Sequence, residues 1–173
     1  RERLLSLQYL VDGYELDYSE VGYQPMLKDL GALDGVAHVA PRVRFGAMVS
    51  HGEDLRNVVV VAGEPQTEAE LMRVDRYLVE GRYVEEGTRE AAMGRRLLQR
   101  LGMNVGDRFT LVFSTSLGAL RGYTFSVVGA FESGMAYLDD GHVFIPLDVA
   151  QTALDLGAAA TEVLIFATDS SET

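Results

Sequence analysis

The sequence of 173 residues contains no cysteine. Disulfide bonds and thiolate metal sites are therefore excluded, and the sequence suits either side of a membrane. Long apolar runs are also missing. A run such as Val58–Ala62 is far shorter than the roughly 20 residues needed to cross a bilayer. We expect this segment to be soluble, whatever the nature of a longer parent protein.

Positive charge is scarce. The 15 Lys and Arg residues are outnumbered by 26 Asp and Glu residues, which gives a net charge of −11. Proteins that bind the phosphate backbone of nucleic acids depend on Lys and Arg. Nucleic acid is therefore not an expected partner.

The chain starts at Arg1 without an initiating methionine, and no charged segment followed by an apolar one marks a signal peptide. We expect it to be cut from a longer protein. Hydrophobic residues make up 47% of it, enough for one core or for two small lobes that share one.

Helical patterns recur along the chain. An apolar stripe follows Pro25, and Thr67 with Glu70 resembles a capping box before a helix that ends at Gly81. A third helix is predicted over Met93–Leu101, with Leu97 on its apolar face. A fourth is predicted after Asp148, again with a capping-box pattern formed with Gln151.

Alternating and continuous apolar patterns predict strands between these helices. Two of them flank the polar turn at Ser50–Glu53 and suggest a hairpin. The order of helices and strands favours an α+β fold with a layered sheet. The predicted strands cover residues 7–18, 36–48, 55–62, 109–113, 123–131, 142–146 and 162–168.

Two clusters contain residue types found in active sites. Ser50 and His51 lie next to acidic residues, but neighbours on a turn rarely converge as a catalytic triad does, so a polar hairpin turn is the favoured interpretation. Asp139, Asp140 and His142 could bind a metal, although Asp-Asp-Gly is also an ordinary turn before a strand. A small hydrolase or metal-dependent enzyme using either segment stays open as an alternative, and a plain adhesion or scaffold module is a third.

Two further features have simple structural explanations. The glycines between Gly102 and Gly129 fit neither a P-loop nor a dinucleotide-binding pattern, so we interpret them as turn and packing residues. Arg95, Arg96 and Arg100 form a cationic stripe that is expected to be a solvated helix face, with contact to an acidic partner as the alternative. No cofactor is expected.

Six segments, taken in order, carry a further signal. They are "YLVDGYELDYSEVGYQ", "VAHVAPRVRFGAMVS", "VAGEPQTEAELMRVDRYLVEGRYV", "GRRLLQRLGMNVGDRFTLV", "YTFSVVGAFESGMAYLDDGHVFIPLDVAQTALDLG" and "TEVLIFATD". Together they resemble the extracytoplasmic core domain of ABC-transporter permeases of the FtsX-like type, the group that contains MacB and the lipoprotein-releasing permeases LolC and LolE.

The resemblance implies two lobes. A porter-like α+β sandwich would comprise residues 1–79 and 136–173, and an inserted, mostly β, sabre-like lobe would comprise residues 80–135. The segment Met93–Phe113 would then form the base of the inserted lobe, with a mechanical role.

The resemblance also implies a non-catalytic, periplasmic domain of an inner-membrane permease. A separate cytoplasmic ABC ATPase would hydrolyse ATP, a second permease subunit is a possible partner, and the output would be cargo export, lipoprotein release or mechanotransmission. The loop Ser114–Gly122 is shorter than the carrier-binding loop of LolC-like relatives, which argues against carrier recruitment. Its apolar residues Leu117 and Leu120 are the candidate contacts with a partner or cargo, unless they fold back onto their own lobe.

Overall fold

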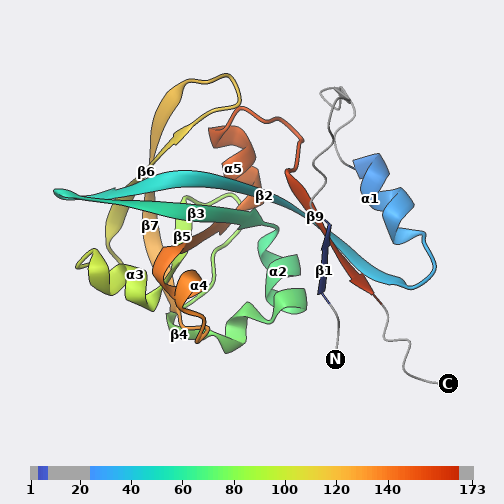
Figure 1. The fold of residues 1–173 in the computed structure, drawn as a ribbon, viewed down its shortest axis with the longest axis horizontal. Coiled ribbons are helices and arrows are strands. Elements are labelled where there is room, and N and C mark those ends of the chain that lie inside the picture. The colour runs from blue at the N-terminus through green and yellow to red at the C-terminus, as the bar shows by residue number, and fades with distance from the viewer. Residues whose placement is uncertain (1–3, 8–23, 168–173) are drawn as a thin grey trace.

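The computed structural model describes residues 4–7 and 24–167, and Figure 1 shows their arrangement. Strands dominate, with short helices packed around them. In chain order the elements are β1 (Leu4–Leu7), α1 (Gln24–Gly31), β2 (Val36–His51), β3 (Asp54–Gly63), α2 (Pro65–Met72), the 3-10 turn η1 (Val74–Arg76), β4 (Leu78–Gly81), β5 (Glu90–Gly94), α3 (Arg95–Arg100), β6 (Arg108–Ser114), β7 (Leu120–Phe131), α4 (Ala136–Gly141), β8 (His142–Pro146), α5 (Leu147–Ala153) and β9 (Glu162–Ala167).

Strands β2, β3, β8, β5, β7 and β6 form a closed circuit of hydrogen-bonded neighbours that returns to β2. The length of β2 closes this circuit. Its residues 42–51 pair with β3 along one edge, while on the other edge residues 36–42 pair with β9 and Met48–Ser50 pair with β6. Strands β3 and β8 are parallel, as are β5 and β7, and the other pairs are antiparallel.

The main hydrophobic core is made by the inward-facing side chains of this circuit. Val43, Val60, Leu111 and Val143 are fully buried there. Leu97 of α3 and residues of α5 complete the cluster. Burying a large aliphatic side chain contributes about 1.5–3 kcal/mol. In Figure 1, α5 lies on one side of the β2–β3 hairpin, and α2, α3 and α4 lie on the other.

The α+β fold class predicted from the sequence is confirmed. The hairpin is β2–β3, and its loop is Gly52-Glu53, because His51 pairs with Asp54. Strands β6, β7, β8 and β9 and helix α5 also occur where the patterns place them. Of the strand predicted over residues 7–18, Leu7 lies in β1, and residues 8–18 lie outside the described residues.

The helix predicted from Thr67 to Gly81 is present only in its first part, as α2, and its predicted end at Gly81 is wrong. Helix α2 begins at Pro65 without a side-chain cap, and Thr67 instead donates a hydrogen bond to the Glu64 carboxylate. Arg73 has a left-handed backbone with φ of 50°, which ends the helix. Residues 78–81 then pair with β7 as a strand, because their backbone groups gain ladder hydrogen bonds there.

Other local predictions also need correction. Met93 belongs to β5, and α3 starts only at Arg95. The predicted Asp139–Gly141 turn is the end of the short helix α4. Asp148 does not cap α5, because the N-cap of this helix is Pro146. The Asp148 carboxylate instead accepts a hydrogen bond from the Gly87 amide.

Strands from both predicted lobes take part in the same sheet. The circuit joins β2, β3 and β8, from the predicted porter-like lobe, to β5, β6 and β7, from the predicted inserted lobe. The division of the chain at residues 79/80 and 135/136 stays a prediction that these pairings do not decide.

Candidate functional site

A pocket of about 380 Å³ lies on the face of β2, β3 and β8 that points away from the main core. Successive side chains of a strand point to opposite faces of the sheet, so the residues between those of the core form this second face. In β3, Val60 belongs to the main core and Val61 lines the pocket. In β8, Val143 belongs to the main core, and His142 and Phe144 line the pocket.

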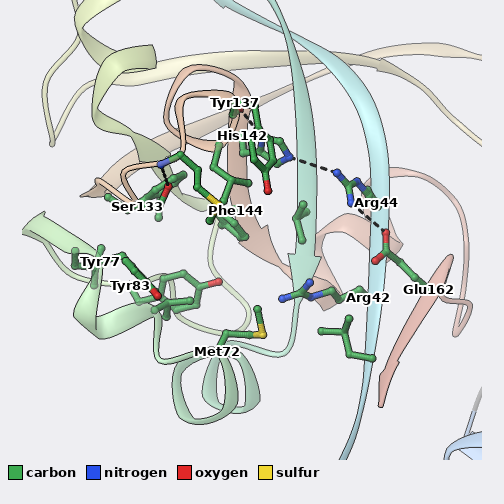
Figure 2. A pocket seen from close by; sticks show the side chains of 18 residues that line it. Arg42, Arg44, Met72, Tyr77, Tyr83, Ser133, Tyr137, His142, Phe144 and Glu162 are labelled. Atoms are coloured by element: carbon green, nitrogen blue, oxygen red, sulfur yellow. Dashed lines mark hydrogen bonds and ion pairs between the residues drawn. The ribbon is translucent and has the colours of Figure 1, made fainter. Parts of the chain in front are cut away.

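The sides of the pocket come from elements that cover this sheet face. Met72 of α2 and Tyr77 lie on one side, and Tyr137 of α4 lies across from them (Figure 2). Leu78 and Leu138 add further apolar surface to the pocket. The pocket is therefore mostly apolar and aromatic, which is the usual character of a small-molecule site.

Arg42 and Arg44 reach this face because they are two residues apart on β2, on either side of the core residue Val43. Arg42 is buried and forms two parallel hydrogen bonds with Glu68, Nε to Oε1 at 2.6 Å and Nη2 to Oε2 at 2.5 Å. Its charge is therefore matched within the protein. Arg44 is more exposed, with 43% of its side-chain surface accessible.

A hydrogen-bonded chain positions Arg44. Nδ1 of His142 lies 3.1 Å from the Tyr137 carbonyl oxygen, so this nitrogen carries the proton and donates. The unprotonated Nε2 can then accept from Nη2 of Arg44 at 3.4 Å. Burial lowers the pKa of His142, the hydrogen bond to Tyr137 opposes this, and the charge of Arg44 lowers the pKa further. At neutral pH the imidazole of His142 is therefore uncharged.

The Tyr83 hydroxyl points into the pocket (Figure 2). Burial raises the pKa of Tyr83 well above its usual value, and the charge of Glu68 adds to this while Arg42 partly offsets it. The phenol therefore keeps its proton and offers a neutral hydrogen-bonding group.

Asp139, from one of the clusters considered for catalysis, has a structural role. Its carboxylate is fully buried and accepts hydrogen bonds from Ser133 N, Ser133 Oγ and Gly134 N at 2.8–3.1 Å. Burial would raise the pKa of Asp139, but these hydrogen bonds and the charge of Arg96 outweigh it and keep the pKa low. The carboxylate thus closes the loop before α4.

The remaining sequence candidates do not meet at one point. Nδ1 of His51 donates to the Arg108 carbonyl oxygen at 3.1 Å, which attaches the β2–β3 turn to β6. Asp140 pairs with Arg100, and Arg95 lies 3.6 Å from Glu80. Within residues 4–7 and 24–167, the structure contains no group of three His, Cys, Asp or Glu side chains that could hold a metal ion.

Leu117 and Leu120 lie at the tip of the β6–β7 hairpin and are exposed, with 82% and 71% of their surface accessible. They do not fold back onto the protein. The tip itself is held in place, because Ser116 N donates to the Leu154 carbonyl at 3.0 Å and Arg121 pairs with Asp155 at 3.0 Å.

Solved structures of low sequence identity share this fold. The extracellular domain of the noncanonic ABC-type transporter YknZ from Gram-positive bacteria matches with a TM-score of 0.68 and 13% identity, over 97% of this chain and 85% of that one. The periplasmic region of MacB from Actinobacillus actinomycetemcomitans matches with a TM-score of 0.60 and 11% identity, over 93% and 74%. A domain of a putative permease from Porphyromonas gingivalis matches with a TM-score of 0.55 and 14% identity, over 88% and 69%.

The chain thus shares its fold with the extracellular domain of one ABC-type transporter and with the periplasmic region of MacB. A family model narrows the assignment. The model of the MacB-like periplasmic core domain matches residues 8–173, and the chain belongs to this family. The resemblance inferred from the sequence is confirmed. In the part of the chain that the structure describes, no helix is long and apolar enough to span a bilayer.

The pocket was not predicted from the sequence. Its charged residues and His142 come from β2, β8 and β9, which lie in three of the six family-like segments, and the patterns in those segments do not indicate a pocket. One signal was available. In "PRVRF", two arginines alternate with a core valine in an otherwise apolar strand, which places two charges on one sheet face.

Proposed function

We propose that this chain is a non-catalytic domain of an ABC-transporter permease, acting outside the cytoplasm and coupled to ATP hydrolysis by a separate cytoplasmic subunit or domain. The observation that carries the proposal is the match of the family model to residues 8–173. The inner membrane as location, a second permease subunit as partner, and export, lipoprotein release or mechanotransmission as output are parts of the same proposal.

Leu117 and Leu120 are the proposed contact with cargo or a partner. Two exposed leucines at a hairpin tip are unfavourable in water unless something covers them. The tip is attached to the end of α5 and can present them in a fixed geometry. A rigid connection between tip and sheet is what transmission of a conformational change requires.

The test uses the full permease with its ATPase in cells that lack the native copy. We expect Leu117→Ser with Leu120→Ser to lose restoration of the deletion phenotype at matched expression, while the partner keeps its ATPase activity. Leu33→Ser is the control, because Leu33 is also exposed, at 56%, but follows α1, which lies away from the β6–β7 hairpin (Figure 1). Full restoration by the double variant would reject the tip as a contact.

A further inference from the structure

We propose that the pocket between α2 and α4 binds an amphiphile that has an apolar body and one carboxylate, and that Arg44 recognises the carboxylate. This site is separate from the hairpin tip. The inference concerns this chain alone and does not depend on the permease function.

The pocket provides a surface for the apolar body of the ligand. Its floor is formed by Val61, Ala92 and Phe144, and its walls include Met72 and Leu78. A ligand there would have side chains below it and on two sides, so most of its apolar surface would leave water. Burial of apolar surface contributes roughly 25 cal/mol per Å².

The mouth extends this apolar surface outward. Tyr77, Met135 and Tyr137 line the pocket and are nevertheless 45%, 47% and 64% exposed. Aromatic and methionine side chains make adaptable apolar contacts. An elongated apolar body could therefore continue from the floor to the rim over mostly apolar side chains.

The charges of the pocket favour an anionic head group. Arg42 and Arg44 line it, together with one carboxylate, that of Glu162. The guanidinium of Arg42 is already bonded at two points to Glu68. The carboxylate of Glu162 is largely covered, with 8% of its side-chain surface accessible, whereas 43% of the Arg44 side chain is accessible. The charge that the pocket offers to a head group is therefore that of Arg44, which an anionic head group complements.

Arg44 has the geometry and the unused donors for this role. Its side chain has a 3.4 Å contact with His142 and lies 4.0 Å from Glu162, which is at the outer limit of an ion pair. A guanidinium carries five N–H donors and matches a carboxylate with two parallel hydrogen bonds. His142, held by the Tyr137 carbonyl, keeps the guanidinium at the pocket (Figure 2).

The experiment titrates the chain with dodecanoate below its micelle concentration, followed by isothermal titration calorimetry. We expect saturable binding with one site, and at least about tenfold weaker binding of dodecyltrimethylammonium, because one charge-assisted pair contributes more than 1.4 kcal/mol. Absence of dodecanoate binding, or equal binding of the cation, would overturn the proposal.

Three variants locate the site. Arg44→Met and Met72→Trp should each weaken dodecanoate binding by about tenfold or more. The first removes the guanidinium that binds the carboxylate, and the second fills the pocket. Arg121→Met is the matched control, because it removes the same charge from a side chain of similar exposure, 40%, outside the pocket. It should bind within about twofold of the parent.

Each variant result decides between the site and its alternatives. Equal losses in Arg44→Met and Arg121→Met would show a general charge effect and reject the site. Unchanged binding in Met72→Trp would place the ligand outside the pocket, with the same consequence. If thermal unfolding shows that Arg44→Met does not fold, Arg44→Lys replaces it, because lysine keeps the charge without the planar fork and should also lose dodecanoate affinity.

Discussion

Arg42 on β2 and Glu68 on α2 form a two-point ion pair that is almost completely covered by the protein. The exposed fractions of the two side chains are 11% and 2%. Gly63 lies beside the pair, and a Cβ atom at this position would overlap the Glu68 carboxylate. The pair attaches α2 to the sheet and so holds one wall of the pocket in place.

We expect Glu68→Leu to lower the free energy of unfolding by about 3–5 kcal/mol, because it leaves the Arg42 charge buried without a partner. The double variant Arg42→Met with Glu68→Leu should recover most of this loss, since it removes both charges from the interior. Urea unfolding followed by circular dichroism measures both. A double variant as unstable as the single one would show that the pair has another role.

Gly94→Ala should destabilise the protein by about 2–3 kcal/mol, because the new Cβ would collide with the backbone carbonyl of Asp139 and force α4 away from β5. The control is Gly46→Ala on β2, where nothing lies within 4 Å of the added atom. This change should stay within about 0.5 kcal/mol of the parent. Equal denaturation midpoints for the two variants would contradict the close approach of α4 and β5.

Leu97→Ala should reduce stability by about 2–5 kcal/mol, because Leu97 is only 1% exposed and part of the main core. Arg96→Ala, one position earlier on the exposed face of α3, should change stability by less than about 0.5 kcal/mol. Chemical unfolding of the two variants at one pH tests this. Similar losses would mean that α3 is rotated relative to the structure.

The pKa of His142 is lower in the folded protein than in the unfolded chain, chiefly because of burial. As the pH falls below about 6.5, the unfolded state therefore binds more protons at His142 than the folded state does. The free energy of unfolding should decrease with decreasing pH until the pH is below the folded-state pKa. Unfolding curves between pH 7.5 and pH 5.5 measure the slope. His142→Gln should reduce that slope, and identical slopes in parent and variant would remove His142 as the cause.

Local patterns predicted elements that bury one face. The β2–β3 hairpin and the strands β6 and β7 have alternating or continuous apolar residues and turn signals that allow few other structures. The patterns failed where pairing with a distant strand decided the outcome. Leu71, Val74 and Leu78 have helical spacing, yet the chain leaves α2 at Arg73 and joins β7 through β4.

The amino-acid sequence left open whether Leu117 and Leu120 are exposed. By itself it determined the α+β class, most of the strands and, through six ordered segments, the family. These properties depend on residues close together in the chain. The tertiary structure alone decided that β6 closes a circuit onto β2, that Arg42 meets Glu68, and that His142 directs Arg44 into a pocket. Arg44 and His142 are 98 residues apart, and only the pairing of β2, β3 and β8 brings them within hydrogen-bonding distance, because each strand places its alternate residues on the same face.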